Sequence, residues 1–129
     1  FIGHNLAIKL STLGSETHVI DGLQVNNIGF YNSNYNSNPN SERYIAFINE
    51  RLSLLRDHKV NLRIIDARDY HLLSQAVSDI SPDVVIHLAA VAHANRSNKD
   101  PFSTFDHSMR TLENVLDSIK NTKTHLIYF

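Results

Sequence analysis

The chain contains 129 residues, which fits one domain, and a hydrophobic content of 42% is enough to form a core. Twelve basic and thirteen acidic side chains give a formal net charge of -1 with no large block of either sign, which argues against binding nucleic acid or a membrane surface through bulk charge. The absence of cysteine excludes disulfides, thiolate metal sites and thiol nucleophiles, and is compatible with the cytoplasmic location that we expect. No apolar run approaches the roughly 18 residues that a transmembrane helix needs.

The first half of the chain is predicted to contain two helices and one strand. Leucines spaced by four and three residues predict an amphipathic helix from residue 3 or earlier, ended by Gly14. A short β-prone run, His18–Ile20, stops at Asp21. The Asn- and Ser-rich stretch from about 24 to 41 is predicted to be a long loop. A helix capped by Asn40 or Ser41 should then run to about residue 57.

The second half continues the alternation of strands and helices. The predicted elements are a strand at 62–65, a helix with its apolar stripe at 72–80 ended by Pro82, a continuous apolar strand within 83–90, a helix whose apolar positions run from 105 to 119, and a strand at 125–129. Strict alternation of this kind predicts an α/β fold with a doubly wound parallel sheet of the Rossmann type.

The expected organisation is one partial domain over residues 1–129. The sequence opens on a helix and closes on a strand. We therefore expect a truncated Rossmann-type domain that lacks its first strand and the C-terminal part that would hold a substrate.

Two residues occupy the spacing of a dinucleotide-binding turn. Such a fold places a glycine at the start of the first helix for the pyrophosphate, and an acid about 20 positions later for the ribose hydroxyls. Gly3 and Asp21 are eighteen positions apart and match these places. A helix-start glycine and a turn aspartate without any ligand would give the same spacing.

Asp66-Ala67-Arg68-Asp69 follows the next predicted strand. Asp66 could accept a hydrogen bond from the exocyclic amine of adenine, while the N–H of Ala67 donates to the ring. In the alternative, structural interpretation, Asp69 caps the following helix and Arg68 pairs with a neighbour.

Small residues close the most hydrophobic strand. Leu88, Ala89 and Ala90 would let a ligand lie against the backbone beyond the carboxyl edge of the sheet. Packing of a helix against the sheet also favours small residues there.

Taken together, these segments resemble the N-terminal half of the extended short-chain dehydrogenase/reductase family, the NAD-dependent sugar-nucleotide epimerases and dehydratases, with UDP-glucuronate 4-epimerase-like members nearest. The resemblance covers essentially the whole chain. It is carried by Phe1-Ile2-Gly3, Leu6, Leu10, Asp21, Asp66 to Asp69, His87 to Ala90, Pro101, Thr111 to Asn114 and Leu126 to Phe129, and the stretch 24–57 is similar to an insertion of the glucuronate epimerases.

The resemblance implies a parent enzyme that transiently oxidises a sugar hydroxyl of a nucleotide sugar with bound NAD, and it is compatible with a homodimer. The catalytic Ser/Thr, Tyr and Lys of the family lie beyond Phe129, so we expect no catalytic residue in this chain. The cofactor-binding residues implied are Gly3, Asp21, Asp66, Ala67, Leu88, Ala89 and Ala90.

Two segments depart from the family pattern. Asn95 and Arg96 stand where related epimerases place a substrate-contacting arginine, and they are weak candidates for substrate binding. The family's Asn-x-x-Gly-Thr appears here as His107, Arg110 and Thr111, which puts the usual packing of that helix in doubt.

NAD is favoured over NADP on electrostatic grounds. Asp21 would accept hydrogen bonds from ribose hydroxyls and repel a 2′-phosphate, and Gly22 and Leu23 supply no compensating cation.

Other readings carry less weight. Eight histidines could indicate a metal site, but His87, His93 and His107 fall on separate elements, and core or surface roles are expected instead. The basic residues Arg96, Lys99 and Arg110 either gather near an anionic ligand or lie on a solvated face. A non-catalytic nucleotide-binding regulatory module of the same fold is the alternative function.

Overall fold

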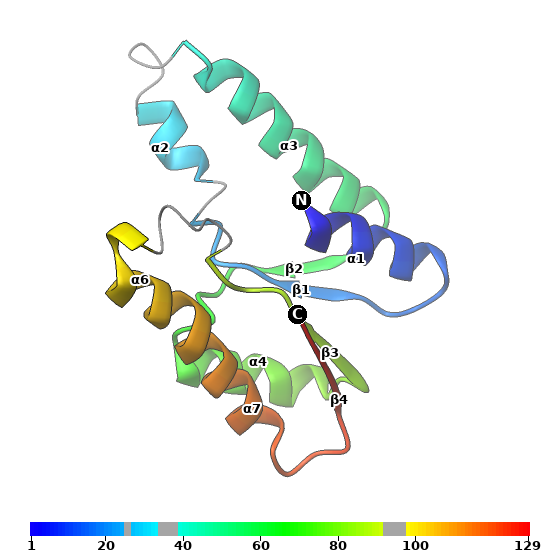
Figure 1. Ribbon diagram of the computed structural model, residues 1–129. Helices are drawn as coiled ribbons and strands as arrows, with labels where there is room; N and C mark the ends of the chain where they lie inside the picture. The colour runs from blue at the N-terminus through cyan, green and yellow to red at the C-terminus, as the bar shows by residue number, and fades with distance from the viewer. Residues whose placement is uncertain (25–26, 34–38, 92–97) are drawn as a thin grey trace. The chain divides into compact units, whose positions relative to one another are not determined.

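The computed structural model describes residues 1–24, 27–33, 39–91 and 98–129. The chain divides into two compact units, Phe1–Ile64 and Ile65–Phe129. Each unit combines helices with one pair of parallel strands (Figure 1). The predicted α/β class with parallel strands is therefore confirmed.

The first unit contains two strands that pair in parallel and helices that cover them. Its elements are α1 (Ile2–Thr12), β1 (His18–Ile20), α2 (Ile28–Ser33), α3 (Ser41–Asp57) and β2 (Asn61–Arg63). His18 lies opposite Asn61 in the β1–β2 ladder, and Ile20 lies opposite Arg63. Helices α1 and α3 pack together on this pair, around a small core formed by Ala7, Leu55 and Val60 with Ile8 and Val19.

Helix α1 ends where the sequence predicts. Gly14 adopts a φ of 95°, in the left-handed region that favours glycine. Its N–H donates to the carbonyl of Ser11, and the N–H of Ser15 donates to that of Leu10. These two bonds form a Schellman motif, which satisfies carbonyls that the last turn of the helix would otherwise leave without donors.

The predicted long loop is wrong over part of its length, because α2 lies within it. The Oδ1 atom of Asn27 accepts from the N–H of Phe30 at 2.9 Å, so an asparagine that composition assigns to a loop begins a helix instead. The ring of Tyr31 then stacks on that of Tyr44 in α3, with centroids 4.9 Å apart. Side-chain packing against α3 thus stabilises a helix that is too short to be stable alone. Residues 34–38 lie outside the described part of the chain.

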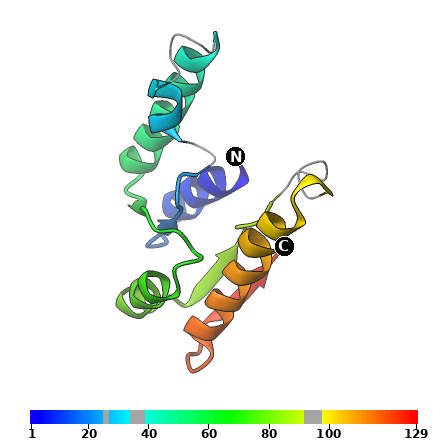
Figure 2. The same cartoon turned by 90° about the vertical axis from the view of Figure 1, so that its left-hand side faces the viewer.

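The second unit repeats the arrangement with different elements. They are α4 (Tyr70–Ile80), β3 (Val84–His87), α6 (Pro101–Phe105), the π-helical turn η1 (Asp106–Arg110), α7 (Thr111–Ile119) and β4 (His125–Tyr128). Strands β3 and β4 are parallel, with Val84 opposite His125. Helices α4 and α7 lie side by side on one face of this pair (Figures 1 and 2). The buried apolar residues of the two helices are Leu73, Ala76, Val77, Val115 and Ile119.

The observed boundaries correct two sequence predictions. The strand expected within 83–90 ends at His87, opposite Tyr128 at the end of β4, so Leu88, Ala89 and Ala90 follow the strand instead of closing it. The strand expected at 62–65 spans Asn61–Arg63, the residues that pair with β1. Helix α4 ends at Ile80, before Pro82 as predicted, with Ser81 in the left-handed conformation.

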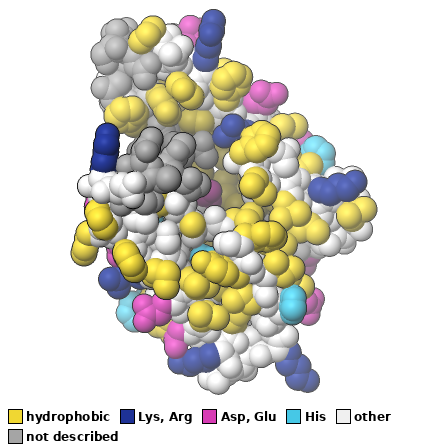
Figure 3. Space-filling view, in the orientation of Figure 1, with side chains coloured by type: hydrophobic (Ala, Val, Ile, Leu, Met, Phe, Trp, Pro, Cys, Tyr) yellow, Lys and Arg dark blue, Asp and Glu magenta, His cyan; other side chains and the backbone are white. Residues whose placement is uncertain are grey.

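Many large apolar side chains remain exposed. Phe102 is 83% exposed, Phe105 66% and Phe129 76%. Hydrophobic side chains are spread over the face shown in Figure 3. Extended exposed apolar surface is typical of regions that bind further protein. Among the described helices, none combines the length and apolar character needed to cross a membrane.

Candidate functional site

The glycine and the acid predicted for cofactor binding lie in the first unit. Gly3 is in the first turn of α1, and Asp21 immediately follows β1. The N–H of Asp21 donates to the carbonyl of Arg63 at 3.2 Å, which extends the parallel ladder by one bond. Its Oδ1 atom accepts from the N–H of Leu23 at 2.7 Å, and Leu23 has a φ of 51°. This Asx turn orients an exposed carboxylate at the carboxyl end of β1.

The predicted adenine motif forms a tight turn at the start of the second unit. The N–H of Arg68 donates to Oδ1 of Asp66 at 3.0 Å, and that of Asp69 donates to the Asp66 carbonyl at 2.9 Å. Oδ1 of Asp69 accepts from the N–H of Leu72 at 3.1 Å and caps α4. The cap foreseen in the structural interpretation is therefore present.

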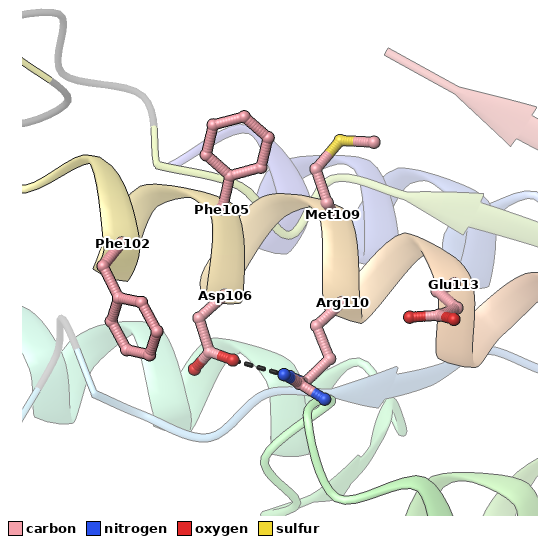
Figure 4. Close-up of a pocket in the computed structure, with 6 residues that line it drawn as sticks. All are labelled: Phe102, Phe105, Asp106, Met109, Arg110 and Glu113. Carbon is pink, nitrogen blue, oxygen red and sulfur yellow. Dashed lines mark hydrogen bonds and ion pairs between the residues drawn. The ribbon is translucent and has the colours of Figure 1, made fainter.

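Arg68 connects this turn to the helical stretch that follows Pro101. Its Nη2 atom lies 2.6 Å from Oδ2 of Asp66, and its Nη1 atom lies 2.8 Å from Oδ2 of Asp106. Nε of Arg110 lies 2.6 Å from Oδ1 of Asp106, the pair drawn in Figure 4. Hydrogen bonds donated by Arg110 and then Arg68 lower the pKa of Asp106, and the bonds that Arg68 donates to Asp66 and Asp106 raise the pKa of Arg68. Four alternating charges thus join the turn to η1.

Asn114 holds the same turn from α7. Its side chain is buried, and its Nδ2 atom donates to the carbonyls of Ala67 at 2.9 Å and Arg68 at 3.0 Å. Of the three N–H groups of residues 67–69, only that of Ala67 lacks an acceptor among the described residues. The turn is therefore fixed by its own bonds and presents one available donor.

The segment after β3 is held from the same helical stretch. The hydroxyl of Thr111, which is buried, has one hydrogen and lies 2.9 Å from the carbonyl of His107, 3.1 Å from that of Ser108 and 3.3 Å from that of Ala89. The N–H of Val91 donates to Oγ of Ser108 in η1 at 3.2 Å. Thr111 and Asn114 are three residues apart, so they share a face of α7. The 66–69 turn is thus held from α7, and the segment after the exposed Ala89 and Ala90 is held at Val91 from η1.

The departure at His107, Arg110 and Thr111 leaves the packing of α7 intact. Arg110 has a half-exposed side chain that pairs with Asp106, so a side chain at the family's glycine position finds room. The hydroxyl of Thr111 bonds the carbonyl of His107 at 2.9 Å, and Nδ1 of His107 bonds the carbonyl of Ser103 at 2.8 Å. The change coincides with η1, and π turns occur often at functional sites.

His87 is a core residue. Burial lowers the pKa of its imidazole, and its ring stacks on that of Tyr128, with centroids 5.8 Å apart. Nε2 of His87 is buried without a hydrogen-bond partner in the described part of the chain. The described residues form no group of three potential metal ligands. His93, Asn95 and Arg96 lie outside the described residues.

A shallow hollow lies on the outer face of the helical stretch 101–119 (Figure 4). Its lining is mainly apolar and exposed, with Asp106 and Arg110 at one side. The lining residues are Phe102, Phe105, Asp106, Met109, Arg110 and Glu113.

Sequence reasoning missed the roles of Asn114 and Asp106. Both are distant in sequence from the turn that they hold. The sequence does contain a signal for Asn114, because this polar residue lies beside Val115, which shares the apolar stripe of the helix with Ile119. A polar amide next to the buried face of a helix needs a partner, and here the partner is the backbone of the turn.

The chain matches the model of the NAD dependent epimerase/dehydratase family over residues 1–129. It is 29% identical over 75 residues to a UDP-glucose 4-epimerase of Mycoplasma pneumoniae, covering 58% of this chain and 22% of that protein. It is 34% identical over 64 residues to a UDP-glucose 4-epimerase of Lacticaseibacillus casei, covering 50% of this chain and 19% of that protein. The matches therefore span about a fifth of the length of these curated relatives.

Solved structures show the same fold. A UDP-glucose-4-epimerase from Stenotrophomonas maltophila, crystallised with NAD and formylated UDP-arabinopyranose, superposes with a TM-score of 0.72 at 19% identity, covering 99% of this chain and 33% of that one. Pal from Bacillus thuringiensis gives a TM-score of 0.69 at 23% identity, covering 99% of this chain and 35% of that one. With the family match over the whole sequence, the chain belongs to the NAD dependent epimerase/dehydratase family.

Proposed function

We propose that this chain is the NAD-binding part of a UDP-sugar 4-epimerase. The observation that carries the proposal is the 66–69 turn, in which the N–H of Ala67 is the donor without a described acceptor. A fixed turn with one available donor fits a ring nitrogen of adenine. The family match and the UDP-glucose 4-epimerase relatives support the assignment of the parent activity.

Asp66 would accept from the exocyclic amine of the same base. Its carboxylate already accepts several bonds from Arg68, so the amine would compete with the guanidinium for an oxygen. Arg68 also pairs with Asp106, so it would keep an anionic partner if the adenine amine replaced one of its hydrogen bonds to Asp66. The turn can therefore accommodate the base without leaving an unpaired cation.

The remaining cofactor contacts follow from strand ends and a helix start. Asp21 would bind the ribose hydroxyls and disfavour the 2′-phosphate of NADP. Gly3 would let the pyrophosphate approach the first turn of α1. Leu88, Ala89 and Ala90 would line the path of the cofactor beyond β3.

The substrate-binding part and the family's catalytic Ser/Thr, Tyr and Lys would be supplied by other residues of the full-length protein.

When bound, NAD would supply transient oxidation of a sugar hydroxyl, and this chain would fix the cofactor. UDP-glucose is the first substrate to test, because the curated relatives are UDP-glucose 4-epimerases. UDP-glucuronate is the second, because the segment containing α2 and α3 follows the proposed ribose acid, as an insertion of the glucuronate epimerases does.

The experiment uses the full-length protein that contains this chain. Calorimetric titration should show binding of NAD in preference to NADP, and the protein should interconvert C4 epimers of UDP-glucose or UDP-glucuronate. NAD binding without turnover of either sugar would favour the non-catalytic regulatory module instead. Absence of NAD binding would refute the cofactor assignment.

A further inference from the structure

We propose that Asn114 is a positioning residue for the adenosine half of the cofactor. Its buried amide holds the 66–69 turn against α7, so that the N–H of Ala67 is fixed where the base would bind. The inference rests on the proposed NAD-binding function and deepens it, because it names a residue that would set the affinity for adenosine without touching it.

The geometry of the amide explains the assignment. A side-chain amide nitrogen has two hydrogens, and Nδ2 of Asn114 directs them to the carbonyls of Ala67 and Arg68, at 2.9 and 3.0 Å. These carbonyls belong to consecutive peptide units, so two bonds from one group fix the orientation of both. Asn114 is only 8% exposed, so water is poorly placed to replace the lost donor.

The rest of the turn is fixed from the same helical stretch. Asp106 pairs with Arg68, whose N–H and guanidinium both bind Asp66. The peptide units around Ala67 are therefore held by Asp106 of η1, through Arg68, and by Asn114 of α7. A donor fixed in advance loses little conformational entropy when a ligand binds, which strengthens binding without any new contact.

The effect should be confined to one half of the dinucleotide. Asn114 donates both amide hydrogens to carbonyls of the turn, and we propose that the turn contacts only the adenine of the dinucleotide. Loss of these bonds should therefore weaken the binding of AMP, which contains the adenosine. The binding of nicotinamide mononucleotide, which lacks the adenosine, should not change. Substitution of a residue that is needed only for folding would weaken the binding of both ligands.

The test compares variants of the full-length protein by competition against NAD. Asn114→Asp keeps the shape but replaces the donor by an acceptor facing two carbonyls. Asn114→Ser retains a single donor. Ser118→Ala is the matched control, because the one acceptor of the Ser118 hydroxyl among the described residues is the Asn114 carbonyl within α7, at 2.7 Å.

For Asn114→Asp, we expect the Ki of AMP to rise about tenfold or more, and that of nicotinamide mononucleotide to stay unchanged. Asn114→Ser should show a smaller rise, and Ser118→Ala none. If Asn114→Asp does not fold, the Asn114→Ser comparison decides.

Two results would overturn the inference. An unchanged Ki of AMP in the Asn114 variants would show that the turn does not need this residue. An equal rise for both ligands would show a general structural role. Failure of the wild-type protein to bind NAD or AMP is a different outcome, because it would remove the proposed function itself.

Discussion

Two aspartates follow neighbouring parallel strands, but their surroundings differ. The turn after β1 contains a side-chain bond from the N–H of Leu23 to the exposed carboxylate of Asp21. The turn at Asp66 is held by Arg68, by Asp106 through Arg68, and by the buried amide of Asn114. The two turns therefore illustrate two ways in which a protein can position a group for ligand binding. The first supplies a single charge, whereas the second supplies a rigid backbone.

Removal of the central acid of the rigid turn should have the largest effect. Asp66→Ala removes the acceptor for the N–H and guanidinium of Arg68, so unfolding free energy should fall by about 1–2 kcal/mol and NAD affinity by about tenfold to a hundredfold. Chemical denaturation and calorimetric titration of the full-length protein measure the two quantities. Asp66→Asn is the control, since it keeps an oxygen for the Arg68 N–H and should lose less stability. Equal stability of Asp66→Ala and wild type would show that the turn is not held through this carboxylate.

The turn after β1 should behave in the opposite way. Asp21→Asn keeps an oxygen for the N–H of Leu23 and removes only the charge, so stability should change by less than about 0.5 kcal/mol. NAD affinity should fall by about tenfold, and the preference for NAD over NADP should shrink because repulsion of the 2′-phosphate is lost. Titration of both cofactors against wild type and variant checks this. An unchanged ratio of the two affinities would remove Asp21 from the ribose site.

A variant that changes stability without touching either turn provides the reference for both. Gly14→Ala should lower the unfolding free energy by about 1 kcal/mol, because a φ of 95° is unfavourable for a residue with a Cβ. Apart from its neighbours in the chain, no atom of the described residues lies within 4 Å of the added Cβ, so backbone strain is the expected cost. NAD affinity should stay at the wild-type value, and Ser15→Ala should match wild type in both measurements. A fall in affinity for Gly14→Ala would mean that stability alone accounts for the effects at Asp66.

The sequence was most informative where a structure depends on residues close together in the chain. Gly14 and the Asp69 cap were predicted because local chemistry determines them, and the parallel strands were predicted from the alternation of strands with helices. Helix α2 was missed because its capping bond and its tyrosine stack override a loop-like composition. Asn114 was missed for another reason, since its partners lie 46 and 47 positions away. A sequence shows that such a residue needs a partner but not which one the fold supplies.

The smallest expected effect is a pH dependence of the stability that Asp106 gives to the rigid turn. Hydrogen bonds from Arg110 and then Arg68 hold the pKa of Asp106 below its ordinary value of 3.8. A lowered folded-state pKa means that the ionised group contributes stability above the unfolded-state pKa, and that this contribution is lost as pH falls through the folded value. The difference in Tm between wild type and Asp106→Asn should therefore be constant near neutral pH and shrink in acid below about pH 4. Because Asp106 is partly exposed, added salt should reduce the difference near neutral pH as well. A difference in Tm that is independent of pH would show that the charge of Asp106 does not stabilise the turn, and would leave Asn114 as its principal anchor.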